Sequence, residues 1–168
     1  MLNRIRPLLL AALCAAAFAA PALAKGPPWI SIELPTNPYD QTMKGAFLLV
    51  HAFHHGTPMG YIVSGSAEGI VNGARRSVKL EFSETSREGV YALKRTWSKE
   101  GTWTLVITAN QGPGDGATAV VEIGPDGEVA SVKVPTEQRG NWTVPRQVSI
   151  NEVDDALRAR AATLARKS

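Results

Sequence analysis

Cysteine is almost absent from the sequence: Cys14 is the single one among 168 residues. It lies in residues 1–24, a segment that we expect to be cleaved from the mature chain. The mature protein, residues 25–168, would then have no thiol, no disulfide and no cysteine ligand for a metal. Small exported domains often rely on disulfides, but a chain of this length can bury an apolar core without them.

An excess of charge of one sign is also missing. The sequence has 18 Lys and Arg against 15 Asp and Glu, and Arg4 and Arg6 fall in the segment expected to be cleaved. The remaining basic residues are scattered and alternate with acidic ones. Proteins that bind nucleic acid need a clustered basic face, so we expect no nucleic-acid partner.

No hydrophobic run is long enough to cross a membrane. The apolar run over residues 8–20 follows two arginines and is shorter than the ~20 residues that a transmembrane helix needs. It leads into Pro21-Ala22-Leu23-Ala24, a small-x-small cleavage pattern. This order is typical of a secretory signal peptide. We therefore expect residues 1–24 to be cleaved after Ala24, and a periplasmic or secreted mature chain without a transmembrane segment.

Catalytic motifs are missing as well. The sequence has no G-x-S-x-G nucleophile elbow and no H-E-x-x-H zinc motif. The glycine-rich segment 112–116 lacks the lysine of a phosphate-binding loop, so it predicts a turn between strands. No nucleophile can be paired with a base by spacing, and we expect a protein that is not an enzyme.

Short alternating runs separated by Gly, Pro, Asn and Asp make up most of the chain. Asn72-Gly73 separates two such runs and tolerates the positive φ angles of a type I′ turn, so it predicts a hairpin. Two further hairpins are expected around residues 98–101 and 124–127. This spacing is typical of a β-sandwich or barrel. The predicted strands are residues 29–33, 47–53, 60–71, 74–82, 90–97, 102–109, 117–123 and 128–134.

The last residues change to a helical period. Ser149 and Glu152 have the spacing of a capping box. We expect a β domain over residues 25–148, then a helix over residues 149–168 that packs on this domain or docks on a partner. The apolar residues on one helical stripe are Ile150, Val153, Leu157, Ala161 and Leu164.

A family resemblance rests on the middle of the chain. The segment Gly89-Val90-Tyr91-Ala92-Leu93 is followed by Trp97 and by Gly101-Thr102-Trp103, which leads into a β-branched strand. Over roughly residues 46–109 this pattern resembles the YtkA-like and FixH-like exported domains. The resemblance implies a role in copper handling or in the assembly of membrane respiratory proteins.

The fold that we expect is an all-β, immunoglobulin-like antiparallel β-sandwich with a C-terminal α-helix. The resemblance and the spacing of the strands both favour it. At a corner of such a sandwich, Tyr91 can bury its ring and bond its hydroxyl to the backbone. Trp103 is expected to present one apolar face together with Leu105 and Ile107.

All three histidines fall within one short segment: His51, His54 and His55, followed by Met59. Imidazole is a common metal ligand, and a thioether favours Cu(I). In an ideal strand His54 faces away from His51 and His55, so convergence requires a bend. These four residues are the predicted metal site, with Met43 as a further soft donor. The alternative is a core histidine followed by a polar strand end.

The function that we expect is an exported, non-enzymatic binding module acting through a protein partner in the bacterial envelope. The alternative is a periplasmic copper-binding protein that uses the histidine cluster. Trp29 and Trp142 lie near the two ends of the folded part, and we expect core residues rather than exposed anchors. The ligand, the strand order and the oligomeric state stay open.

Overall fold

The computed structural model describes residues 26–34, 37 and 39–166. The predicted signal peptide, residues 1–24, lies outside this range. Among the described residues, no helix combines the length and the apolar character needed to span a membrane.

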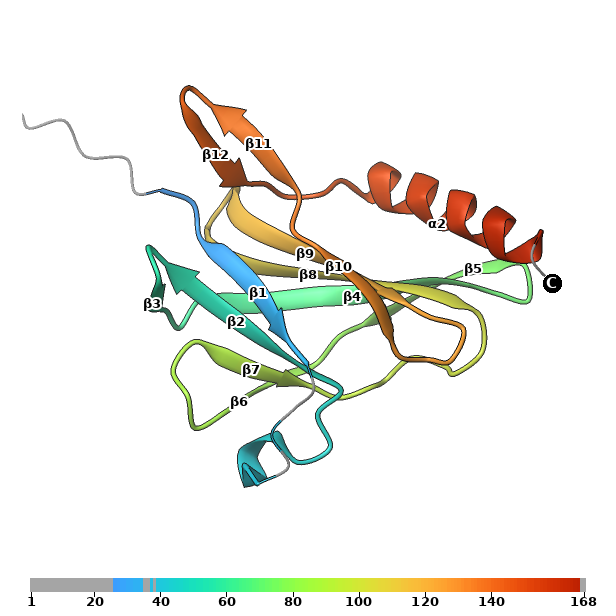
Figure 1. Cartoon of the computed structure of the whole chain (residues 1–168), viewed down its shortest axis with the longest axis horizontal. Helices are drawn as coiled ribbons and strands as arrows, with labels where there is room; N and C mark the ends of the chain where they lie inside the picture. The colour runs from blue at the N-terminus through green and yellow to red at the C-terminus, as the bar shows by residue number, and fades with distance from the viewer. Residues whose placement is uncertain (1–25, 35–36, 38, 167–168) are drawn as a thin grey trace, which may run out of the picture.

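Two five-stranded sheets face each other (Figure 1), and all their strand pairs are antiparallel. The order is β1-β2-β7-β6 in the first sheet, where β3 also pairs with β2, and β10-β9-β8-β4-β5 in the second. The first sheet contains β1 (Trp29–Glu33), β2 (Leu48–His54), β3 (Thr57–Pro58), β6 (Phe82–Glu84) and β7 (Val90–Leu93). The second contains β4 (Ile62–Val71), β5 (Ala74–Lys79), β8 (Thr102–Gly112), β9 (Asp115–Ile123) and β10 (Val129–Lys133).

This strand order is that of an immunoglobulin-type sandwich. When β1, β2, β4, β6, β7, β8 and β9 take the letters A to G, the first sheet reads A-B-E-D and the second contains G-F-C. That is the immunoglobulin arrangement. The predicted fold, a β-sandwich of this type with a C-terminal helix, is confirmed.

The core lies between the two sheets. Val50 of β2 and Ile107 of β8 are fully buried in one apolar cluster. Trp103 of β8 pairs with Gly69 of β4 in register, and its ring occupies the space over the glycine. A Cβ on Gly69 would lie 2.4 Å from Cε3 of Trp103. Gly69 therefore makes room for one of the two tryptophans of the core.

Strand β2 is buried on both faces, as its continuous apolar run predicts. Leu48 and Val50 belong to the cluster between the sheets. Leu49 packs instead with Met43, from the 3-10 turn η2 (Gln41–Met43), in a second small cluster. The outer face of the first sheet is thus covered at this point.

Two of the three predicted hairpins are confirmed. Asn72 (φ 50°) and Gly73 (φ 76°) connect β4 to β5, and residues 124–127 connect β9 to β10. Segment 112–116 also forms a turn, between β8 and β9, as expected.

The hairpin predicted around residues 98–101 is wrong. β7 pairs with β2 and β6, whereas β8 pairs with β4 and β9, so the chain crosses between the sheets here. Trp97 explains the crossing, because it is 5% exposed within the core cluster and stacks edge-on against Phe47 at 5.2 Å. Because the Trp97 side chain is buried in the core, the connection leads from the first sheet to the second instead of returning along the first.

Tyr91 of β7 makes the predicted bond to the backbone. Its hydroxyl donates to the carbonyl oxygen of Tyr61 at 2.7 Å. Tyr61 immediately precedes β4, so this bond links the two sheets at one end of the sandwich.

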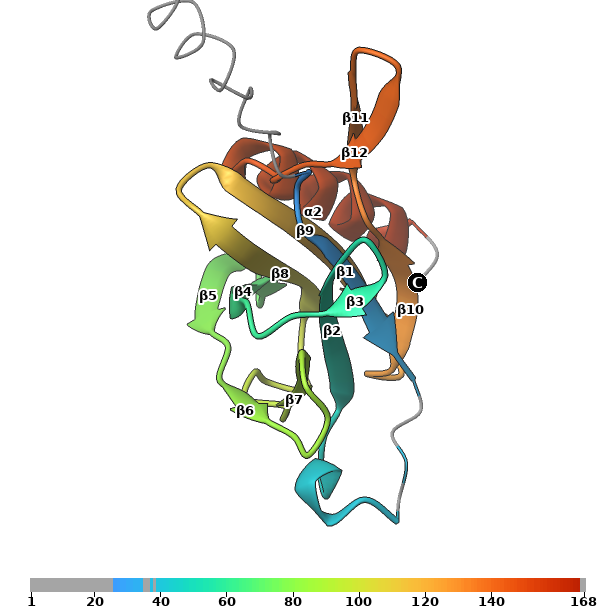
Figure 2. The same ribbon diagram turned by 90° about the vertical axis from the view of Figure 1, so that its left-hand side faces the viewer.

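A separate hairpin was not anticipated from the sequence. β11 (Thr136–Arg139) and β12 (Trp142–Pro145) form a two-stranded sheet, which stands away from the sandwich (Figure 2). Gly140-Asn141 connects them, with Gly140 at φ 61°. A Gly-Asn dipeptide between two short runs is a recognised two-residue hairpin signal.

The C-terminal helix α2 (Ile150–Ala165) packs on the second sheet. The capping box is confirmed: the Ser149 N–H donates to Glu152 Oε2 at 3.0 Å, and the Glu152 N–H donates to Ser149 Oγ at 3.3 Å. Val153 and Leu157 are buried, whereas Ile150 is exposed. The side chain of Leu164, also on the predicted stripe, lies outside the described residues.

A buried carboxylate connects the helix to the sheet. Glu68 of β4 is only 4% exposed and pairs with Arg75 of β5 at 2.6 Å, and Arg75 pairs with Asp154 of α2 at 2.6 Å. Burial favours a raised pKa for Glu68, but hydrogen bonds from Ser66, Arg75 and Ser77 outweigh it and lower the pKa below its ordinary value. Arg75 therefore stabilises the charged form of Glu68 beneath the helix.

We predict that Arg75→Ala lowers the free energy of unfolding by about 2–3 kcal/mol, because it leaves Glu68 buried without its cation. Arg76→Ala, at the exposed neighbouring position, should change it by less than about 0.5 kcal/mol. Urea unfolding curves measure the free energy of unfolding of both variants.

The effect of Arg75→Ala should depend on pH. Because the Glu68 pKa is lowered on folding, the stabilisation from this carboxylate is present above the ordinary pKa of 4.5 and is lost as the pH falls through the folded pKa. The Arg75→Ala and unmodified curves should therefore converge in acid, and equal effects of the two variants at neutral pH would contradict the assignment.

Candidate functional site: a tryptophan-lined groove beside a histidine pair

A groove lies between the start of the described chain and the projecting hairpin. Its volume is about 530 Å³. Gly26, Pro27 and Trp29 line one side, and β11–β12 supplies the other. The remaining lining residues are His55, Arg139, Trp142, Thr143 and Val144.

Two tryptophans give this groove its apolar character. Trp142 is 77% exposed and Trp29 is 37% exposed. The expectation that both are core residues is wrong, because both are exposed. The two-stranded hairpin projects beyond the sandwich (Figures 1 and 2), and Trp142 begins its second strand, whereas Pro145 at the end of that strand is buried.

His54 and His55 lie together at the edge of the same groove. Their ring centroids are 4.1 Å apart with the planes at 71°. His54 ends β2, and His55 follows in a left-handed conformation (φ 48°) that starts the turn into β3. Nε2 of His54 also donates to the carbonyl oxygen of Gly26 at 3.0 Å. The turn thus brings two imidazoles next to the start of the described chain.

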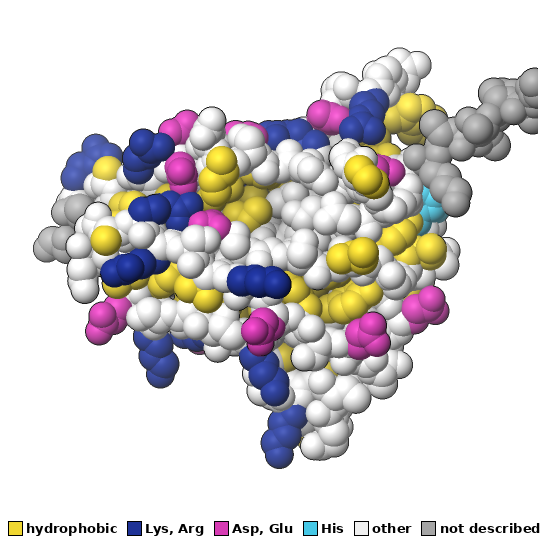
Figure 3. Space-filling model, turned by 180° about the vertical axis from the view of Figure 1, so that it is seen from behind, with side chains coloured by type: hydrophobic (Ala, Val, Ile, Leu, Met, Phe, Trp, Pro, Cys, Tyr) yellow, Lys and Arg dark blue, Asp and Glu magenta, His cyan; other side chains and the backbone are white. Residues whose placement is uncertain are grey.

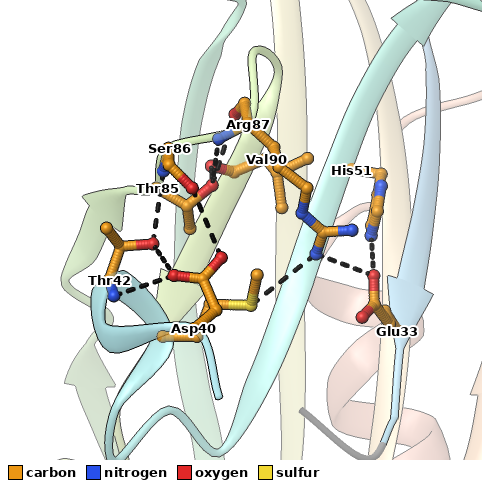
Figure 4. A network of polar contacts seen from close by, with 9 residues as sticks. Glu33, Asp40, Thr42, His51, Thr85, Ser86, Arg87 and Val90 are labelled. Carbon is orange, nitrogen blue, oxygen red and sulfur yellow. Dashed lines mark hydrogen bonds and ion pairs between the residues drawn. The ribbon is translucent and has the colours of Figure 1, made fainter. Parts of the chain in front are cut away.

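His51 lies on the other face of β2, as strand alternation requires. Its Nε2 is 2.7 Å from Glu33 Oε2 on the neighbouring strand β1, and Arg87 Nη2 is 3.0 Å from the same oxygen (Figure 4). Burial favours a raised pKa for Glu33, but its bonds to Arg87 and His51 prevail and lower it. His51 is therefore hydrogen-bonded within a polar network on the outer face of the first sheet, in which Arg87 and Glu33 form the ion pair.

The same network includes the loop that covers this face. Arg87 Nη2 also lies 3.7 Å from Met43 Sδ. Asp40 accepts hydrogen bonds from the N–H and hydroxyl of Thr42 and from the hydroxyl of Ser86 (Figure 4). These contacts fix the η2 segment to the loop before β7.

The four predicted metal ligands are thus only partly brought together. The structure pairs His54 with His55 and places His51 on the opposite face of β2. The backbone of Met59 is fixed by a bond from its N–H to the Ala52 carbonyl oxygen at 2.9 Å. Among the residues that the structure describes, no group of three or more His, Cys, Asp or Glu side chains is arranged to hold a metal ion.

Figure 3 shows the molecule from behind. On that face, basic and acidic side chains are interspersed over the sheets, and apolar atoms appear in small areas between them (Figure 3). The groove beside β11–β12 is the candidate site because two tryptophans and His55 line it together.

Comparisons with family models, with curated proteins and with solved structures returned no match to this chain. The resemblance to YtkA-like and FixH-like domains therefore stays a prediction. The groove residue Arg139 was missed from the sequence and Trp142 was assigned to the core, although the Gly140-Asn141 turn signal marks the hairpin that carries them.

We predict that Trp142→Ala changes the free energy of unfolding by less than about 0.5 kcal/mol, because its side chain is largely exposed. Trp103→Ala, in the core, should cost about 3–5 kcal/mol. Denaturant unfolding of both variants checks this. A large loss of stability in Trp142→Ala would show that the hairpin packs on the sandwich and that the groove is closed.

Proposed function

We propose that this chain is an exported, non-enzymatic binding module that acts through a protein partner in the bacterial envelope. Export rests on the signal-peptide pattern of residues 1–24. The observation that favours a protein partner is Trp142, 77% exposed beside a second tryptophan in a groove of about 530 Å³. Tryptophan is among the residues that contribute most to protein–protein binding energy.

The hairpin also offers a backbone surface for binding. Among the residues that the structure describes, β11 and β12 pair only with each other, so each strand presents an outer edge to a partner. An extended segment of a partner can add to such an edge, and its main-chain hydrogen bonds then supply affinity. We propose that the partner presents an extended segment along this hairpin and an apolar side chain to the groove.

A copper-binding function is the second candidate, and the His54–His55 pair supports it. The two rings lie 4.1 Å apart at the groove edge, and imidazole is a preferred ligand for copper. In this proposal His51 contributes nothing, because it is paired with Glu33 on the other face of β2.

We predict that a photo-crosslinking amino acid at position 142 captures one defined envelope protein when the full chain is expressed with its own leader. The matched control is position 39, where Tyr39 is 89% exposed next to η2, at the far end of the sandwich from the hairpin (Figure 1). The adduct at position 142 should weaken strongly when Trp29 is changed to alanine, because the groove then loses one wall.

Mass spectrometry of the adducts identifies the captured protein. Equal adducts from positions 142 and 39 would indicate non-specific contact, and the absence of any adduct at position 142 would count against the groove as the docking site.

We predict for the second candidate that the mature chain binds copper with a Kd below about 1 µM, and that His54→Ala with His55→Ala abolishes binding. His51→Ala is the matched control and should retain the affinity. Calorimetric titration with Cu(II), and with Cu(I) under anaerobic reducing conditions, measures both. If neither ion produces heat or a shift in melting temperature, the pair is a structural feature of a binding module.

A further inference from the structure

The outer edge of β11 is a second interaction surface on the projecting hairpin. The groove lies along the other strand: Trp142 and Thr143 point to opposite faces of β12, because successive side chains alternate along a strand, yet both line the groove. The groove therefore follows the edge of β12. In the part of the chain that the structure describes, β11 pairs only with β12, so its other edge is accessible to a different strand.

The hydrogen-bond pattern of the hairpin shows which backbone groups of β11 point outward. The Arg146 N–H donates to the carbonyl oxygen of Pro135 at 3.0 Å, just beyond the paired residues. Hydrogen-bonded and non-hydrogen-bonded pairs alternate in an antiparallel ladder. The pair Thr136–Pro145 is therefore of the second kind, and so is the pair that contains Gln138. The N–H and C=O groups of Thr136 and Gln138 thus point to the outer edge, whereas on β12 Pro145 offers no donor.

We propose that the outer edge of β11 pairs antiparallel with the same edge of a second copy of this chain, centred on Gln138. A two-fold axis at this position places Gln138 opposite its own counterpart, and the two residues exchange N–H···O=C bonds through their outward-pointing groups. The same axis places Glu137 opposite Arg139 of the second copy, and Arg139 opposite Glu137 of the second copy.

The charges of Glu137 and Arg139 determine this register. In the single chain Arg139 Nε lies 2.6 Å from Glu137 Oε1, and these side chains are 55% and 39% exposed. In the dimer each carboxylate would face the guanidinium of its own strand and that of the second copy, so the four charges alternate in sign. Opposite charges directly across antiparallel strands stabilise the pairing, and like charges destabilise it. Pairing centred on residue 137 or 139 would place two identical charges opposite each other.

This charge pattern distinguishes β11 from a protected edge. Charged side chains on an edge strand commonly prevent pairing with another chain, but the charges of β11 complement those of its own copy. A pairing of about five residues buries less than the ~1,200 Å² of a stable complex. We therefore expect a weak dimer that depends on protein concentration.

The dimer would present both grooves on one face. Arg139 and Trp142 are opposite each other in the hairpin and therefore share a face of it. A two-fold axis perpendicular to the joined sheet keeps this face, so the Trp142 side chains of both copies lie on the same side. A partner with two binding segments can then engage both grooves, which raises its overall affinity without any new contact.

Charge reversal tests the interface in the chain exported with its own leader. Sedimentation equilibrium from ~1 µM to ~1 mM should show a monomer–dimer equilibrium. Glu137→Arg and Arg139→Glu each place like charges across the interface and should weaken the dimer at least about tenfold, and the two changes combined should restore it. Arg158→Glu, which breaks an exposed pair with Asp155 on α2, is the matched control and should leave the dimer unchanged. Melting temperatures confirm that each variant is folded.

Cysteine substitution tests the register, since the described residues contain no cysteine. Gln138→Cys meets its counterpart in a hydrogen-bonded pair with Cα atoms ~5.5 Å apart, which suits a disulfide, and mild oxidation should give a covalent dimer. Thr143→Cys is the control and should give none, because both β11 strands lie between it and its counterpart.

A monomer over the whole concentration range, or a dimer that is indifferent to the single charge reversals, would overturn the inference. Both outcomes leave the proposed protein partner standing, because photo-crosslinking at position 142 tests it separately. A covalent dimer through position 143 instead of 138 would also overturn the inference, because it would place the second copy on the edge that lines the groove.

Discussion

The apolar packing between the two sheets is the interaction on which the structure depends, because the described residues contain no cysteine to join them covalently. Strands β2 and β8 each place alternate residues in this layer, and Trp103 fills the space above Gly69. A fully buried aliphatic side chain contributes about 1.5–3 kcal/mol. A slip of one residue in the β4–β8 register would turn the whole inner row toward solvent. The core therefore fixes the register as well as the stability.

The alternation of side chains along β2 also determines which groups the histidines contact. β2 is fixed in the first sheet by Val50 and Ala52, which face the core, so His51 must face outward and pair with Glu33. Only His54 and His55, at the strand end, are free of this constraint. The left-handed conformation of His55 turns the chain there and brings the rings together. The three histidines, which are close together in the sequence, thus separate in the structure. His51 bonds Glu33 on the outer face, and His54 and His55 form a pair at the strand end.

Much of the fold follows from patterns that act locally. The Asn72-Gly73 turn and the capping box of α2 depend on neighbouring residues, and both were predictable. The crossing between β7 and β8 was not predictable. It depends on the burial of Trp97 between the two sheets, and the sequence does not determine the order of the strands in either sheet. Trp142 was misjudged for a related reason. Its apolar character predicts burial, but its exposure follows from the position of a hairpin with no partner layer.

The two proposed functions share one corner of the molecule, and this makes them interdependent. His55 lines the groove beside Trp142 and also belongs to the histidine pair, while Gly26 borders both. An ion held by His55 would change the charge and shape of the groove floor, so copper and a partner would alter each other's affinity. Such coupling is reciprocal by thermodynamic necessity. A partner that binds the groove more tightly when copper is present must strengthen copper binding by the same factor, and a partner that displaces His55 must weaken it.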